Sequence, residues 1–128
     1  MALETRTRIT ILVPSPTTAA QIIVLNDALD ELIAFCGGIT TTHTSGQTPA
    51  AYDSPLFAGC WFDTKTNNVV QDGNVYIFGD APLPVRDHDL QGYLEVLKVE
   101  WQQKFEQDII WIIIHEVQRV ANDDYRRD

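Results

Sequence analysis

The stretch "DIIWIIIHEVQRV", residues Asp108–Val120, decides the fold because it holds an unbroken run of six apolar residues, Ile109–Ile114. His115 and Glu116 follow this run at once. In a strand, successive side chains point to opposite faces of the sheet, so three of these apolar side chains would occupy each face. A strand on a sheet with one open face should alternate apolar and polar residues, and this strand does not. We therefore expect both faces of this last strand to be covered.

Hydrophobic periodicity predicts the other elements of the chain. Alternating β-branched residues indicate strands, and apolar residues spaced three and four apart indicate helices. The resulting order is strand, helix, strand, strand, helix, strand. The predicted helices are Thr18–Cys36 and Leu90–Phe105. The predicted strands are Arg8–Val13, Ile39–Ser45, Asn74–Asp80 and Asp108–Val120. The segment Phe57–Asp63 is predicted to form a hairpin with Asn74–Asp80 through the polar turn 64–68.

Both predicted helices carry signals at their ends. Thr18 can cap the first helix, and Gln21 stands three residues later, as a capping box requires. Gly37–Gly38 can end this helix, where a left-handed residue is needed. Asp87 or Asp89 can cap the second helix, and a carboxylate there also suits the positive end of the helix dipole.

This order predicts a ferredoxin-like βαββαβ α+β sandwich, with residues 1–128 forming a single domain and both helices on one face of the sheet. Right-handed crossovers place the first and third strands of that pattern at the centre and the last strand at an edge. The segment "FAGCWFD", Phe57–Asp63, extends the hairpin between the second and third strands.

The face away from the helices is expected to be partly apolar. If the isoleucines and valines of the central strands face the helices, this other face carries Thr10, Leu12, Tyr76 and Phe78. Such a surface is too apolar for solvent alone, so we expect a homo-oligomer, with a dimer favoured, packed sheet to sheet or edge to edge. The alternative is that the loop Ser45–Pro55 and the terminal "ANDDYRRD" fold over this face.

Composition excludes several classes of protein. The formal charge of −9 over 128 residues disfavours nucleic acid and anionic membrane surfaces, since both need clustered Lys and Arg. No apolar run approaches the roughly 20 residues of a membrane-spanning helix, and "MALETRTRIT" lacks a signal-peptide core. Two cysteines, Cys36 and Cys60, imply no disulfide framework. We expect a cytoplasmic protein.

Signals for catalysis are weak. "HEVQR" begins like the zinc-protease motif but has Arg119 in place of the second histidine, and consecutive strand residues His115 and Glu116 would face opposite ways. "RDHDL", residues 86–90, suits helix initiation better than a metal site. We therefore predict no catalytic residue, no metal and no cofactor. The candidate ligand or interface residues are Thr42, His43, Trp61, Tyr76, Phe78, Trp111 and His115.

Short motifs give the chain a resemblance to a group of short bacterial proteins with no assigned activity. The motifs are "GGIT", "GCWFD", "VVQDGNVYIF" and "KFEQDIIWI", and they span about Leu29 to Ile114. The matching positions are Gly37, Gly38, Thr40, Gly59, Trp61, Asp72 and Gln107. The resemblance implies the fold and a bacterial origin. The loop Ser45–Pro55 departs from the group's pattern, so any site in that loop would be peculiar to this chain.

These features favour a non-enzymatic homo-oligomer that binds a small molecule or a protein partner. At the level of fold it resembles the PII-like and ACT-like regulators, although the absence of basic phosphate-binding residues disfavours a nucleotide. The acidic charge would also suit a basic protein partner. The alternative is an enzyme of the dimeric α/β-barrel kind, with an aromatic-lined pocket on the face away from the helices; His43 and His115 would be its test residues.

Overall fold

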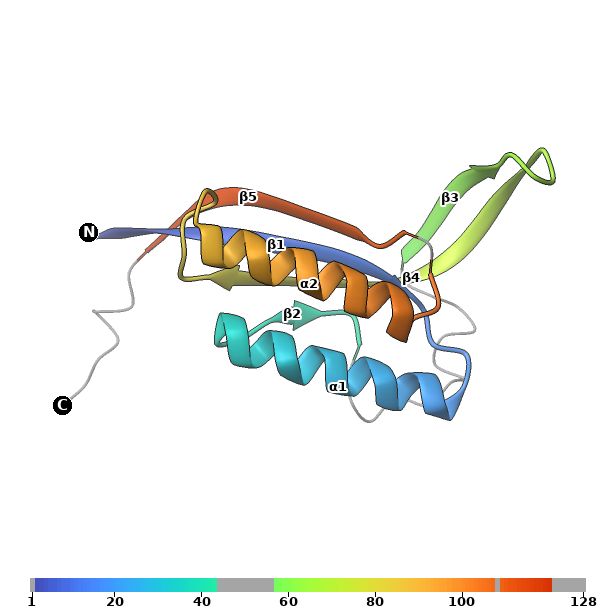
Figure 1. Ribbon diagram of the computed structural model, residues 1–128, viewed down its shortest axis with the longest axis horizontal. Coiled ribbons are helices and arrows are strands. Elements are labelled where there is room, and N and C mark those ends of the chain that lie inside the picture. Colours follow the sequence, from blue (N-terminus) through green and yellow to red (C-terminus); the bar gives the residue numbers. More distant parts are fainter. Residues whose placement is uncertain (1, 44–56, 108, 121–128) are drawn as a thin grey trace.

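The computed structural model describes residues 2–43, 57–107 and 109–120 as one layer of helices packed on one sheet (Figure 1). Two helices and five strands are described. Their bounds are β1 Leu3–Pro14, α1 Ala19–Cys36, β2 Thr40–Thr41, β3 Phe57–Asp63, β4 Asn68–Ala81, α2 His88–Lys104 and β5 Trp111–Val120.

The sheet has the ferredoxin-like arrangement predicted from the sequence. Its strand order is β2-β4-β1-β5, and β3 pairs only with β4. Every described pairing is antiparallel, with β1 and β4 at the centre and β5 at an edge. Both helices cover the same face of the sheet, while β3 and the first part of β4 project beyond them as a hairpin (Figure 1).

The helix caps follow the sequence signals with two refinements. The Oγ1 of Thr18 accepts a hydrogen bond from the backbone N–H of Gln21 at 3.1 Å, as expected. The Gln21 side chain, however, accepts from the backbone N–H of Thr17 at 2.7 Å, one residue before the capping position. Gly37 ends α1 in the left-handed conformation, with φ of 83°. Of the two candidate caps of α2, Asp87 takes the role by accepting from Leu90 N–H at 3.0 Å.

The hairpin pairs in a different register from the prediction. We expected Phe57–Asp63 to pair with Asn74–Asp80, but it pairs with Asn68–Asn74. The segment Val75–Ala81 pairs with β1 instead. One continuous strand, β4, therefore serves both the projecting hairpin and the centre of the sheet. Its 14 residues make this possible.

The last strand is regular well past its apolar run. Ile109 and Ile110 precede β5, and His115 and Glu116 lie within β5, which continues to Val120. His115 and Glu116 therefore lie inside the strand, as the predicted segment Asp108–Val120 implies, and the observed strand begins three residues later than predicted. Their pairing partners are adjacent residues of β1, so the two side chains do point to opposite faces.

The core lies between the helices and one face of the sheet. Its central residues, which we call the helix-covered face, are all fully buried: Ile9, Ile11, Val13, Val75 and Ile77. The rings of Phe35 and Tyr93 stack at 3.8 Å between centroids and join α1 to α2. The Cys36 side chain, beside Gly79 of β4, is half-buried, and this burial raises the pKa of its thiol to about 11. The described chain thus buries the helix-covered face fully, and partly buried side chains such as Phe35 and Ile114 pack around it.

Candidate functional site

The opposite face of the sheet carries a block of nine side chains in three rows. The register places Leu12 between Tyr76 and Trp111, Thr10 between Phe78 and Ile113, and Arg8 between Asp80 and His115. We call this block the open sheet face. Its members are Arg8, Thr10, Leu12, Tyr76, Phe78, Asp80, Trp111, Ile113 and His115.

One end of the open sheet face is apolar and aromatic. The rings of Tyr76 and Phe78 meet edge to face with centroids 5.9 Å apart. Trp111 and Ile113 continue this surface on β5 and are 64% and 53% exposed. The described chain therefore leaves two large apolar side chains in contact with water beside two aromatic rings, which is typical of an interaction surface.

The other end of the open sheet face is charged. Arg8 donates two hydrogen bonds to the Asp80 carboxylate, at 2.8 and 3.0 Å, while its guanidinium lies 4.5 Å from the centroid of the Phe78 ring. The Arg8 hydrogen bond holds the pKa of Asp80 below its ordinary value. Further along the same face, Glu4 pairs with Arg119 at 2.7 Å and Arg6 at 3.1 Å, and these contacts lower the pKa of Glu4.

The structure separates the sequence candidates into two groups. Tyr76, Phe78, Trp111 and His115 lie on the open sheet face. Thr42 lies beside them, since its Oγ1 accepts from the backbone N–H of Tyr76 at 3.2 Å. The strand register brings these residues together on or beside one face of the sheet.

His43 and Trp61 lie elsewhere. His43 is buried toward the helices, where its Nε2 is 2.6 Å from the Asn26 Oδ1 of α1. It therefore lies on the opposite side of the sheet from His115, and the two histidines cannot form one catalytic pair. The backbone of Trp61 pairs opposite Val70 in the projecting hairpin, and its side chain lies outside the described residues. The loop Ser45–Pro55 and the terminal "ANDDYRRD" lie there too.

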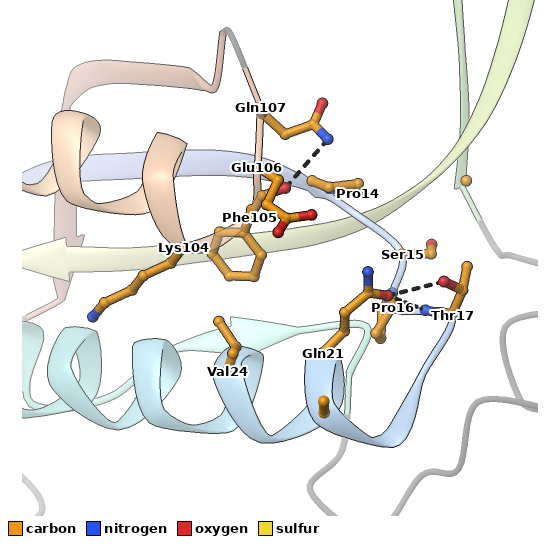
Figure 2. A pocket seen from close by; sticks show the side chains of 12 residues that line it. Pro14, Ser15, Pro16, Thr17, Gln21, Val24, Lys104, Phe105, Glu106 and Gln107 are labelled. Atoms are coloured by element: carbon orange, nitrogen blue, oxygen red, sulfur yellow. Dashed lines mark hydrogen bonds between the residues drawn. The ribbon is translucent and has the colours of Figure 1, made fainter.

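A cavity of about 640 Å³, missed by the sequence analysis, lies between the start of α1 and the end of α2 (Figure 2). The β1–α1 connection forms one wall and the last turn of α2 the other. Its lining residues are Pro14, Ser15, Pro16, Thr17, Ala20, Gln21, Val24, Gly73, Lys104, Phe105, Glu106 and Gln107. They come from three separate stretches of the sequence, 14–24, 73 and 104–107, and form no motif, so no local pattern could have found the cavity.

The cavity combines an apolar floor with a few polar groups. The Phe105 ring and the Val24 side chain project into the space between the two helices (Figure 2). The Gln21 side chain and the Glu106 carboxylate face each other across it (Figure 2). Glu106 adopts a left-handed backbone conformation, with φ of 53°, at the end of α2. Ligand sites commonly have this composition of apolar walls and few, well-placed polar groups.

Within the described residues, no three His, Cys, Asp or Glu side chains gather closely enough to hold a metal ion. Neither α1 nor α2 combines the length and the apolar character that crossing a bilayer requires.

Comparison with known proteins gives a fold and no family. No family model and no curated protein matches the chain, so the motif resemblance to short bacterial proteins is not confirmed. A phage SAM lyase in complex with S-methyl-5'-thioadenosine is similar in structure, with a TM-score of 0.56, 12% identity and 92% of each chain covered.

A second solved structure is similar over nearly the whole chain. It is CPII, a nitrogen regulatory PII-like protein from Thiomonas intermedia K12, bound to ADP, AMP and bicarbonate. Its TM-score is 0.51 at 15% identity, with 94% of this chain and 98% of that chain covered. At these identities the likeness shows the ferredoxin-like α+β fold alone.

Proposed function

We propose that this protein is a non-enzymatic homo-oligomer of the bacterial cytoplasm that binds an adenosine-containing small molecule. The open sheet face is the observation that carries the proposal. It supplies the surface through which copies associate, so Tyr76, Phe78, Trp111 and Ile113 act as interface residues. A dimer is the smallest assembly that would bury this face.

Exposure and charge on this face both favour a second copy of the chain as the occupant. β5 stands at the edge of the sheet, and its residues Trp111 and Ile113 are more than half exposed. An exposed apolar edge strand is an aggregation hazard unless a partner covers it. The chain carries a formal charge of −9, but Arg6, Arg8 and Arg119 neutralise the nearby carboxylates here. Two copies can therefore approach through this face with little repulsion.

The ligand class is supported by the two similar structures. One holds S-methyl-5'-thioadenosine, and the other holds ADP and AMP. An adenosine group is common to all three ligands. Neither end of the open sheet face, nor the cavity, presents a cluster of unpaired basic side chains that could grip a polyphosphate. An uncharged adenosine derivative is therefore a better ligand than a nucleotide.

Native mass spectrometry of the purified full chain tests this proposal. We expect an assembly of two or more chains at micromolar concentration, which gains the mass of adenosine when adenosine is added. A monomer at every concentration would contradict the interface, and an assembly that takes up no adenosine would contradict the ligand class.

An enzyme is the second candidate, favoured by the likeness to a phage SAM lyase and by the aromatic end of the open sheet face. Two such faces could enclose a pocket lined by Tyr76 and Trp111, with His115 near its rim. Incubating the protein with SAM and following SAM by chromatography separates the candidates. We expect SAM to be unchanged; SAM consumption that falls in His115→Ala would favour the enzyme.

A further inference from the structure

We propose that the cavity between α1 and α2 is the site for the adenosine group, and that it selects uncharged or cationic nucleosides over nucleotides. The inference rests on the proposed function for its ligand class, but it places the ligand within one chain, away from the open sheet face. The cavity volume of about 640 Å³ falls within the range of small-molecule sites, roughly 300–1,000 Å³.

The first argument is the fixed orientation of the Gln21 amide. Its Oε1 accepts from both the backbone N–H and the hydroxyl of Thr17, at 2.7 and 2.9 Å. Because these donors define which amide atom is the oxygen, the Nε2 group must point the other way. Figure 2 shows that it points across the cavity toward Glu106. A donor and an acceptor thus face the same space.

This donor–acceptor pair matches the edge of adenine. The base presents an amino group, which donates, beside a ring nitrogen, which accepts. The Glu106 carboxylate can accept from the amino group, and the Gln21 Nε2 can donate to the ring nitrogen. A glutamine amide is a common partner of this edge of adenine. Gln21 belongs to α1 and Glu106 to the turn that follows α2, so only the folded chain presents the two side chains together.

The second argument is the apolar lining. Phe105 and Val24 face the cavity from the two helices, and Pro16 faces it from the β1–α1 connection (Figure 2). Phe105 is held by an edge-to-face contact with the buried Trp101, with centroids 5.6 Å apart. An aromatic ring held in place in this way provides a stacking surface for any flat heterocycle.

The third argument concerns charge and unfilled hydrogen bonds. Lys104 extends away from the cavity in Figure 2 and pairs with Glu31 at 3.4 Å. The charge that faces the cavity is therefore the Glu106 carboxylate, which repels phosphate. The Ser15 Oγ beside the cavity is buried and has no hydrogen-bond partner within the described chain. Rotation about its Cα–Cβ bond would let it bond to a ribose hydroxyl.

An NMR titration of the ¹⁵N-labelled full chain with adenosine tests the assignment. We expect the amide shifts to change at residues 15–24 and 104–107. Glu106→Gln should weaken adenosine binding at least tenfold, because it replaces the charged acceptor. Glu95→Gln, on the exposed side of α2, is the matched control and should leave binding unchanged. AMP should bind at least fivefold more weakly than adenosine.

A further variant separates this inference from the proposed function. Trp111→Ala weakens the interface but leaves the cavity untouched, so adenosine should bind it with unchanged affinity. Shifts confined to the open sheet face would overturn the cavity assignment while leaving the ligand class in place. Equal affinity of the wild type and Glu106→Gln would overturn it as well. If adenosine binds nowhere, both the cavity assignment and the ligand class fail, whatever the state of assembly.

Discussion

The two faces of the same sheet differ in how completely the chain covers them. On β1, Ile9, Ile11 and Val13 face the helices and are fully buried. Thr10 and Leu12 alternate with them but face away and remain half-buried. Strand alternation produces both sets from one stretch of sequence. Among the described residues, the helix-covered face is fully buried within one chain, whereas the open sheet face is only partly covered. Our proposal assigns the cover of the open sheet face to a second copy of the chain.

The largest expected effect is at the helix-covered face. Ile11→Ala should lower the free energy of unfolding by about 2–5 kcal/mol, because it leaves a cavity in a closed core. Its neighbour Leu12→Ala is the matched comparison and should cost the monomer less than half as much, since Leu12 already contacts solvent. Urea denaturation at low protein concentration measures both. An equal loss of unfolding free energy in the two variants would contradict the proposed difference between the two faces.

The next effect is on association. Trp111→Ala should weaken self-association by about 2 kcal/mol, roughly thirtyfold in Kd, as expected for a central aromatic residue of an interface. Its exposure of 64% means that the stability of the monomer should hardly change. Dilution isothermal calorimetry measures the association constant. A mutant with a less stable monomer but an unchanged association constant would assign Trp111 to the core instead.

A third prediction concerns the close packing of α1 on the sheet. A Cβ at Gly79 would lie 3.0 Å from the Cys36 Sγ and 3.1 Å from the Gly38 carbonyl oxygen. Gly79→Ala should therefore destabilise the fold by about 1–3 kcal/mol through overpacking. Gly92→Ala is the control: a Cβ there meets no atom within 4 Å, so it should stabilise α2 by up to about 1 kcal/mol. Thermal unfolding of both variants measures the two changes in stability. If Gly79→Ala leaves the stability unchanged, α1 can shift to make room for the added methyl group.

The smallest effect is at the charged end of the open sheet face. The pKa of Asp80 is lowered in the folded state by Arg8, so this pair stabilises the fold above the ordinary pKa of 3.8 and loses its effect as pH falls through the lowered value. Both side chains are partly exposed, so the contribution should stay below about 1 kcal/mol. Asp80→Asn should be less stable than the wild type at pH 7 and equal to it near pH 2. A difference that persists in acid would contradict the pairing.

The sequence predicts the fold well where periodicity is strong. Alternation in Ile9–Val13 and Val75–Phe78 identifies the two central strands, and Thr18 and Gly37 mark the ends of α1. The sequence does not predict the register of the hairpin, because β4 continues without interruption from the hairpin into the sheet. His115 pairs with Arg8 and lies within β5, as the predicted strand Asp108–Val120 implies.

The two candidate sites differ in the same way. The open sheet face could be predicted in part, because strand alternation places Thr10, Leu12, Tyr76 and Phe78 on it. The unbroken apolar run of β5 left open which of its residues join them. The cavity could not be predicted, because Gln21 and Glu106 are ordinary polar residues that lie 85 positions apart in the numbering and meet only after α1 and α2 pack together. Sequence patterns report local geometry, and a site formed between two helix ends is not local.

Sedimentation velocity of the wild-type chain across a dilution series, from high to low micromolar concentration, tests the central claim most directly. We predict an assembly of two or more chains that dissociates on dilution, since the described residues leave large apolar side chains of the open sheet face exposed. A single monomeric species throughout the series would contradict the account, and would mean that the open sheet face is not an interface between copies of this chain.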